Sequence, residues 1–393
     1  MPRAARQDRS RLSGGPVRRP GSGALGGLAR HDVGLFVAAG GASVVGALLV
    51  WSATVRTAGS AYLVRHLVTA AVGLALALLV ARAGRDRVRA AAPWVWGLAV
   101  VLLLLVPTPL GTTVNGARSW LPLGAGFTLQ PAEVAKAGVV LALAALLAGR
   151  LDRGAGPGRR EVLLGLVVVG VPTALVVLQP DLGSALVLAA AGAVVLVVGG
   201  LPLRWVALLT AAAAGLAVAA WTTPLLSAYQ RARLTTFLDP AADPQGAGYQ
   251  VRQVRLAIEG GGLWGQGFMA GPRTQGGFVP FQLNDFVFSV AGEELGFVGA
   301  AGLVVLLGVL VLRILVVAAR AEDALGRLVG VGVATWLAVQ VVQNVGMNLG
   351  LLPVTGLPLP FVSYGGSSML VSWLAVGLVD AAQGSRRRPP TRP

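Results

Sequence analysis

The stretch LGSALVLAAAGAVVLVVGG, residues 182–200, contains no charged side chain and decides the class of fold. About 20 mostly apolar residues in a helix are enough to cross the roughly 30 Å hydrocarbon core of a membrane. Lipid offers no partners for backbone N–H and C=O groups, and the sequence lacks the alternating strands of a membrane barrel. We therefore expect an all-α polytopic membrane protein, a bundle of about ten transmembrane helices, at residues 33–54, 61–83, 92–109, 130–149, 161–178, 182–200, 203–222, 284–318, 325–349 and 361–382.

The composition supports a membrane protein and excludes several other classes. Hydrophobic residues make up 55% of the 393 residues and charged residues only 12%, whereas soluble domains have about 25% charged residues. The chain has no cysteine and 2 histidines, which excludes disulfide scaffolds and thiolate catalysis and leaves little for a histidine-rich metal site. Its net charge of +16 invites a nucleic-acid interpretation. Long uncharged runs separate the basic residues, so we expect no nucleic-acid partner.

The distribution of arginine predicts the orientation and the domain organisation. Most Arg residues lie before the first span, in alternate connections and in the tail, so the positive-inside rule places both termini in the cytoplasm. We interpret residues 1–32 as a disordered basic arm, 33–382 as one transmembrane domain and 383–393 as a basic tail. Connection 223–283 is far longer than a usual link between helices and is rich in aromatic residues and Arg. We expect it to be a folded outer loop that faces an anionic ligand.

Lys136 is the only lysine in the chain, and it lies inside a predicted span. Glu133 is three residues earlier and therefore on the same helical face. Two interpretations remain open: the pair neutralises itself within the bundle, or the ammonium binds a phosphate. Arg118 and Trp120 stand on an outer segment before that span. They form either an interfacial belt with a snorkelling Arg or, with Lys136, the cationic part of a pyrophosphate site.

Asp285 stands where the long loop enters the span at 284–318. It could cap the helix, or it could be a functional carboxylate whose pKa is raised by desolvation or lowered by neighbouring cations. Glu293 and Glu294 follow in the same helix and point about 100° apart, so at least one should pack against a cation or a polar helix. Asp181, in the turn QPDLG, is interpreted as a structural helix cap.

The connection NLGLLPVTGLPLPFVSYGGSS, residues 348–368, holds three prolines between two spans. Irregular backbone at membrane depth is tolerated where it is buried in protein or lines a wet cavity. The end of this connection offers hydroxyl groups and glycine amides to a ligand, at Ser363, Tyr364, Gly365, Gly366 and Ser367.

Seven motifs, in order, resemble those of the SEDS family (shape, elongation, division and sporulation proteins), whose members include RodA and FtsW. They are NGARSWL at 115–121, QPAEVAK at 130–136, QPDLGSAL at 179–186, FLDPAADPQGAGYQ at 237–250, AIEGGGLWGQG at 257–267, NDFVFSVAGEELGFVG at 284–299 and LPVTGLPLPFVSYGGSS at 352–368. The resemblance covers nearly all of the chain except the basic tails. The LPVTGLPLPF form, together with QPDLG, resembles the RodA branch more than the FtsW branch.

The resemblance implies a ten-span peptidoglycan glycosyltransferase of the bacterial cytoplasmic membrane. Such a protein polymerises lipid II, an undecaprenyl-pyrophosphate-linked disaccharide peptide, on the outer face for cell elongation, and its partner is a class B penicillin-binding protein. The family motif places the catalytic carboxylate on Asp285. This chain departs from the family just before that residue, because it lacks the Glu and His that often precede the Asp.

One base and several cations would serve this chemistry. Asp285 would take the proton of the attacking hydroxyl, and cations would stabilise the departing pyrophosphate. A divalent cation, Mg²⁺ or Mn²⁺, would suit such a reaction, but the sequence shows no clear ligand cluster for it. The expected substrate-binding residues are Arg118, Trp120, Glu133, Lys136, Arg231, Arg252, Arg255, Ser363, Tyr364, Gly365, Gly366 and Ser367. Three alternatives remain open: a lipid II flippase, an FtsW-type septal polymerase, and a scaffold without catalytic activity.

Overall fold

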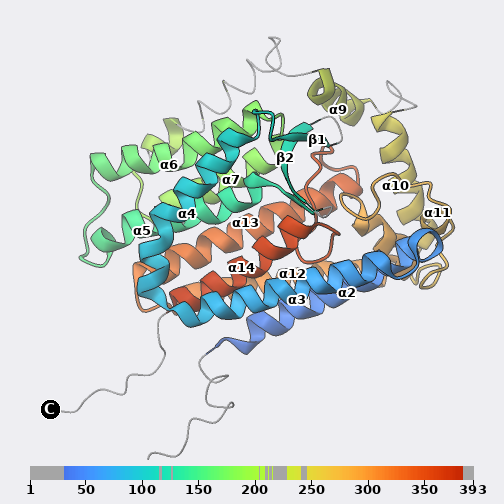
Figure 1. Ribbon diagram of the computed structural model, residues 1–393, viewed down its shortest axis with the longest axis horizontal. Helices are drawn as coiled ribbons and strands as arrows, with labels where there is room; N and C mark the ends of the chain where they lie inside the picture. The colour runs from blue at the N-terminus through green and yellow to red at the C-terminus, as the bar shows by residue number, and fades with distance from the viewer. Residues whose placement is uncertain are drawn as a thin grey trace, which may run out of the picture.

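The computed structural model describes residues 31–383 except 115–116, 125–126, 203, 209–210, 212–214, 216–227 and 240–245. Its long helices lie side by side in one bundle (Figure 1). The helices are α2 (Val33–Ala58), α3 (Ala61–Ala83), α4 (Arg85–Leu105), α5 (Pro131–Leu151), α6 (Arg159–Leu178), α7 (Leu182–Val198), α9 (Ala228–Leu238), α10 (Ala247–Gly261), α11 (Pro272–Gln275), α12 (Val287–Ala319), α13 (Ala324–Asn348) and α14 (Gly366–Ala382).

These helices confirm the predicted polytopic membrane fold. Within the described residues, 7 helices are long and apolar enough to cross a membrane, and α7 and α14 are shorter apolar helices. Each of them corresponds to one of the predicted spans. The remaining predicted span, 203–222, lies largely outside the described residues, as do almost all of the predicted basic arm and tail.

The first and last long helices meet at one end of the bundle. Asp380, near the end of α14, accepts a hydrogen bond from the backbone N–H of Asp32 at 2.8 Å and lies 2.6 Å from His31 Nδ1. Asp32 in turn caps α2 and pairs with Arg313 of α12 at 2.9 Å. The network places the start of α2 and the end of α14 on the same side, as the orientation prediction requires.

A small antiparallel sheet, which was not predicted from the sequence, connects α4 to α5. It has the order β1 (Thr112–Val114), β2 (Ala117–Gly124) and β3 (Phe127–Leu129). Its strands are short, and its pairing shifts register at both ladders. Ser367 ties it to α14, because its hydroxyl donates to Thr128 O at 2.9 Å. The helical fold therefore includes one small sheet, which contacts the start of α14.

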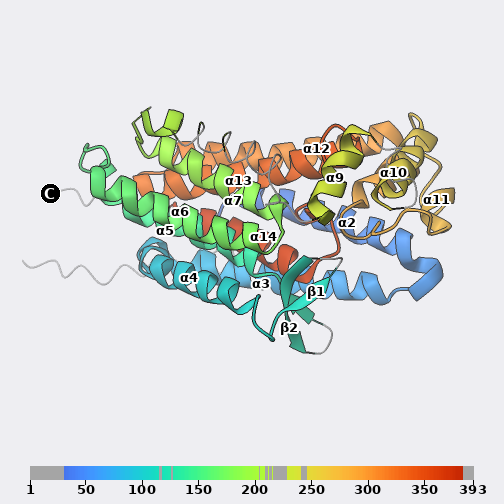
Figure 2. The same cartoon turned by 90° about the horizontal axis from the view of Figure 1, so that it is seen from above.

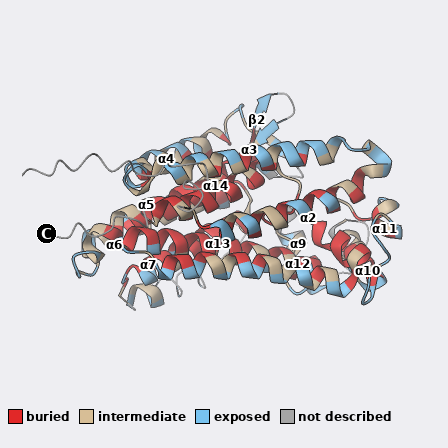
Figure 3. Ribbon diagram, turned by 90° about the horizontal axis from the view of Figure 1, so that it is seen from below, coloured by how far each residue is buried: buried red, intermediate tan, exposed pale blue. Residues whose placement is uncertain are grey.

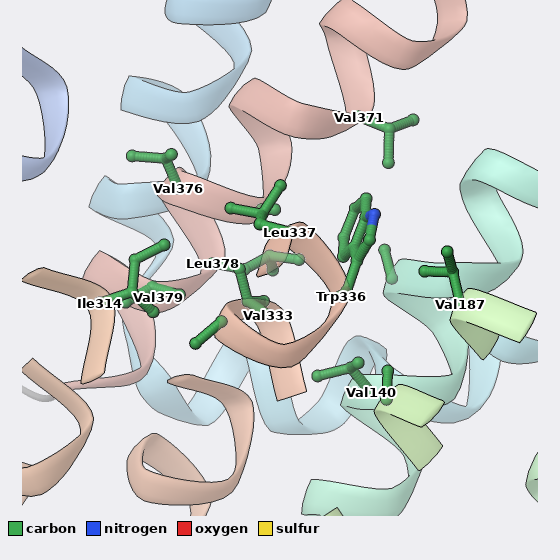
Figure 4. Packing of buried hydrophobic residues seen from close by; sticks show 14 of the residues in the cluster. Val140, Val187, Ile314, Val333, Trp336, Leu337, Val371, Val376, Leu378 and Val379 are labelled. Atoms are coloured by element: carbon green, nitrogen blue, oxygen red, sulfur yellow. The ribbon is translucent and has the colours of Figure 1, made fainter. Parts of the chain in front are cut away.

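The buried core is centred on α5, α13 and α14, whereas α3 and α4 are largely exposed (Figure 3). Trp336 of α13 is fully buried. Figure 4 shows its ring among Val140, Val187 and Val371, which come from α5, α7 and α14. Where helices cross closely, glycine makes the contact possible: a Cβ on Gly377 would lie 2.5 Å from a backbone oxygen of α3.

A tryptophan completes the hydrogen bonding of a helix that contains proline. Pro172 lies inside α6 and has no N–H, so the carbonyl of Val168, four residues earlier, loses its usual helical partner. Trp96 of α4 donates its indole N–H to that carbonyl at 3.0 Å. The contact joins α4 to α6 and satisfies a backbone group that lipid could not.

The predicted outer loop is folded in its described part, where it contains α9, α10 and α11. Figure 2 shows α10 and α11 at one end of the bundle, hereafter the loop end. Glu293 of α12 accepts hydrogen bonds from the N–H groups of Arg273 and Thr274, each at 2.8 Å. Glu294 accepts from Gln275 Nε2 at 3.1 Å and from a serine of α2. The two adjacent carboxylates thus serve different partners, and both attach the loop to the bundle.

Candidate active site

Asp285 precedes α12 and does not cap it. The cap position is Phe286, whose side chain makes no capping hydrogen bond, and the helix begins at Val287. The backbone carbonyl of Asp285 accepts hydrogen bonds from Asn344 Nδ2 at 2.9 Å and Asn348 Nδ2 at 3.1 Å. The carboxylate, which is partly exposed, is therefore held in place through its backbone.

A polar face on α13, which was not predicted from the sequence, provides this support. Gln343 Nε2 donates to Pro353 O at 3.0 Å, and Asn344 Nδ2 donates to Leu357 O at 2.7 Å. Gln340 extends the same face towards the irregular segment. The signal was available, because amides recur at helical spacing in QVVQNVGMN, residues 340–348, within an apolar span.

The SYGGS motif supports the same backbone from the other side. Ser363 Oγ accepts from Leu359 N at 2.7 Å and donates to Asn284 O. Tyr364 N donates to Leu283 O at 2.8 Å. Ser367 is likewise buried and bonded to backbone groups of the strand connection. The hydroxyls of Ser363 and Ser367 thus position the chain around Asp285 and are not free for a ligand in this conformation.

Two charged groups act on the Asp285 carboxylate. Desolvation raises its pKa from the ordinary 3.8 to about 6, the Arg233 guanidinium of α9 opposes this rise, and Asp181 reinforces it. A Cβ placed on Gly356 would lie 3.5 Å from both Asp285 Oδ2 and Arg233 Nη1. The absence of a side chain at Gly356 therefore leaves the carboxylate and the guanidinium facing a common space.

Asp181 itself has the structural role that its motif predicts. Its carboxylate caps α7 by accepting from Ser184 N at 3.0 Å, and it also accepts from Gln130 Nε2 at 2.9 Å. Gly183, in the same motif, packs against the irregular segment, since a Cβ there would lie 3.0 Å from Thr355 Cβ. The QPDLG turn thus carries a fixed negative charge close to Asp285.

Lys136 and Arg118 do not face one crevice. Lys136 is fully buried, and its ammonium donates to Glu133 Oε1 at 2.7 Å and to Gln340 Oε1 at 2.9 Å. It also lies 5.1 Å from the centre of the Trp336 ring. The Arg118 side chain is exposed and donates to a backbone carbonyl at the end of α4. These contacts match the self-neutralising interpretation of the Glu133–Lys136 pair.

A cavity of about 140 Å³ is lined by Asn284, the chain neighbour of Asp285, and gathers other predicted residues. Asn284, Trp120 and Tyr364 line it, together with the glycines at the start of α14. Arg65 and His66 of α3 line it too, and neither of them stands in one of the seven motifs.

A family model for FtsW, RodA and SpoVE proteins, described as "Cell cycle protein", matches residues 32–388. The chain belongs to this family. Peptidoglycan glycosyltransferase MrdB of Escherichia coli K12 is 36% identical over 344 residues, which cover 88% of this chain and 91% of that protein. A probable peptidoglycan glycosyltransferase FtsW of Thioalkalivibrio sp. K90mix is 40% identical over 379 residues, 93% of this chain and 92% of that protein.

Solved structures of the family have the same fold. A chain from work on "Structural coordination of polymerization and crosslinking by a peptidoglycan synthase complex" aligns with a TM-score of 0.75 at 36% identity, over 90% of this chain and 97% of that chain. The crystal structure of Thermus thermophilus RodA aligns with a TM-score of 0.66 at 33% identity, over 90% of this chain and 96% of that chain. The resemblance drawn from the motifs is thereby confirmed.

In this family member, the three cations predicted on the long loop lie at the loop end. Arg231 is on α9, and Arg252 and Arg255 are on α10, all three exposed. Arg255 also donates to Gly350 O at 3.2 Å, at the end of α13. Within the described residues, no group of three or more His, Asp or Glu side chains gathers as a metal site.

Proposed function

We propose that this protein is a peptidoglycan glycosyltransferase that polymerises lipid II on the outer face of the bacterial cytoplasmic membrane, with Asp285 as the general base. Relatives with this printed activity match the chain over most of their length. The observation that carries the assignment of the base is the partly exposed Asp285 carboxylate, which shares the space at Gly356 with Arg233 while its backbone is held by α13. Its pKa of about 6 suits a base that works near neutral pH.

The proposed reaction needs one proton acceptor. The 4-hydroxyl of an acceptor GlcNAc attacks the anomeric carbon of a MurNAc, the bond from that carbon to the lipid diphosphate breaks, and Asp285 takes the hydroxyl proton. The departing diphosphate is already anionic, so no acid has to protonate it. This removes the need for the second carboxylate that glycoside hydrolases use.

The sidedness of the proposal follows from charge. Arg85, Arg150 and Arg313 lie towards the end of the bundle where α2 begins, which the positive-inside rule assigns to the cytoplasm. The loop end, with α10 and α11, then faces outwards. Because a related structure belongs to a complex for polymerization and crosslinking, we propose a class B penicillin-binding protein as partner. Relatives named MrdB and FtsW both match, so roles in elongation and in division both fit.

Purified protein incubated with labelled lipid II tests the assignment. We expect glycan polymer from the wild type, at least a hundredfold less from Asp285→Asn, and wild-type amounts from Asp86→Asn, an exposed carboxylate at the start of α4. Normal polymerisation by a folded Asp285→Asn protein would refute the base. Lipid II scrambling in vesicles that requires Lys136 but not Asp285 would favour the flippase. Neither polymer nor scrambling from the folded wild type would favour the scaffold.

A further inference from the structure

Two arginine side chains converge on one point at the end of the bundle that the positive-inside rule assigns to the cytoplasm. A Cβ placed on Gly149, near the end of α5, would lie 3.0 Å from Arg89 Nη2 and 3.9 Å from Arg153 Nη1. Arg89 is on α4, which packs along α5, and Arg153 stands in the turn after α5 (Figure 1). The absence of a side chain at Gly149 therefore lets both guanidinium groups share one space.

Hydrogen bonds in the connection after α5 hold Arg153 in this position. The N–H of Arg153 donates to Arg150 O at 3.0 Å, and the N–H of Gly154 donates to Leu151 O at 2.9 Å. The guanidinium of Arg150 contacts the Glu161 carboxylate at 3.3 Å and so ties the end of α5 to the start of α6. An ordered turn thus places Arg153 back over the end of α5.

Neither guanidinium group has an acidic partner in the part of the chain that the structure describes. Asp152 is the chain neighbour of Arg153, but its carboxylate accepts from Ala324 N at 2.8 Å. Asp86 precedes Arg89 by three residues and forms no ion pair with it. Two cations that approach one point repel each other, and an anion between them removes this repulsion. The planar guanidinium fork matches the oxygens of a phosphate group.

The exposed side chains of α4 change in polarity along the helix axis as a phospholipid does. Arg89 comes four residues after the helix begins at Arg85, and Trp94 follows it with 79% of its surface exposed. Trp is enriched at the interface between membrane and water. Arg89 stands about 8 Å from Trp94 along the axis, on the side of the polar headgroups. Leu98 and Val101, further along, are exposed apolar residues that suit acyl chains.

We propose that Arg89 and Arg153, with the space at Gly149, bind the phosphate of an anionic phospholipid in the cytoplasmic leaflet. Anionic lipids give this leaflet its negative surface potential, so they are the phosphate compounds concentrated at this level. The bound lipid would join α4 to the connection after α5. The assignment does not depend on the proposed function, because these residues lie away from the loop end of the bundle (Figure 2).

Native mass spectrometry of the detergent-solubilised full chain, titrated with phosphatidylglycerol, tests the proposal. We expect Arg89→Gln and Arg153→Gln each to raise the Kd of the first bound lipid about fivefold, the effect of losing one arginine near an anionic lipid surface. Arg320→Gln, at an exposed position at the end of α12, is the matched control and should bind as the wild type does. Equal weakening by all three substitutions would show that only net charge matters and would overturn the site.

The substitution Gly149→Ala separates the geometry of the site from its charge. The added Cβ would displace the Arg89 guanidinium, so the Kd should rise towards that of Arg89→Gln although the net charge is unchanged. Alanine favours a helix over glycine, so the Tm should equal or exceed that of the wild type. Gly302→Ala, at an exposed helical position with nothing within 4 Å of the new Cβ, should leave the affinity unchanged. Wild-type affinity in Gly149→Ala would overturn the placement of the phosphate.

Thermal unfolding and other ligands identify what is bound. Both arginines are exposed, so Arg89→Gln and Arg153→Gln should unfold at the wild-type Tm without added lipid. Phosphatidylglycerol should raise the Tm of the wild type more than that of either variant, and an equal rise would refute the site. Phosphatidylcholine should bind more weakly, and equal affinity would refute the preference for an anionic lipid. Inorganic phosphate that binds through the two arginines, without binding of phosphatidylglycerol, would overturn the assignment to a lipid.

Discussion

The substitution Asp285→Asn should make the protein more stable at neutral pH. Desolvation raises the carboxylate pKa from 3.8 to about 6, so the folded protein holds a proton that the unfolded chain releases. The carboxyl group therefore costs no stability below about pH 4, where it is protonated in both states. The free energy of unfolding falls as the pH rises from there through 6. The shift corresponds to about 3 kcal/mol when the group is ionised, or about 2 kcal/mol after allowance for its partial exposure. A neutral side chain of the same shape removes this cost.

Thermal unfolding of the purified variants at pH 7.5 and pH 4.5 provides the measurement. We expect Asp285→Asn to unfold at a higher temperature than the wild type at pH 7.5, and the gain to shrink to about a third at pH 4.5, where the wild-type group is protonated. Asp86→Asn, at an exposed position, should change neither value. An equal or lower Tm for Asp285→Asn at pH 7.5, or a gain independent of pH, would refute the argument that the ionised carboxylate is desolvated.

Three further substitutions test the scaffold around the site. Trp96→Phe leaves the Val168 carbonyl without its partner and should cost about 1 kcal/mol, seen as a lower Tm with unchanged polymerisation. Lys136→Met leaves Glu133 buried and unpaired and should cost about 3–5 kcal/mol, and the addition of Glu133→Gln should restore most of the Tm. Asn344→Leu removes the hydrogen-bond donor to the backbone carbonyls of Asp285 and Leu357. It should lower the polymerisation rate about a hundredfold in an assay with labelled lipid II, while the affinity for the lipid diphosphate is retained.

The spans could be predicted from the sequence because one physical requirement controls them. A segment in lipid must be apolar and must satisfy its own backbone, and both conditions are local. The strand connection at 112–129 escaped prediction because its strands are short and their pairing is irregular. Whether such a segment pairs with itself depends on the space that the surrounding helices leave for it. A local sequence pattern does not predict that space.

The site was predictable where a motif places several functional residues next to one another in the chain. Asp285 and the SYGGS segment were singled out in this way, and the structure brings them together, although the serines hold backbone rather than face the cavity. Arg65 and His66 lie outside every motif, and their place in the cavity depends on how α3 is rotated against α14. Rotation is decided by packing between distant helices, such as the close approach of Gly73 to Trp373, and a single sequence does not state it.

The charges around Asp285 have opposite effects on the pKa of its carboxylate, and a bound substrate would change their sum. In the free protein, Arg233 favours the ionised carboxylate, while desolvation and Asp181 oppose it, and the opposing effects prevail. A diphosphate bound beside Asp285 would add negative charge and would attract the guanidinium groups, so it would raise the carboxylate pKa further. A stronger base accepts the hydroxyl proton more readily. The anionic donor would therefore make Asp285 more basic in the complex than in the free enzyme, so that the base gains strength when the donor is in place.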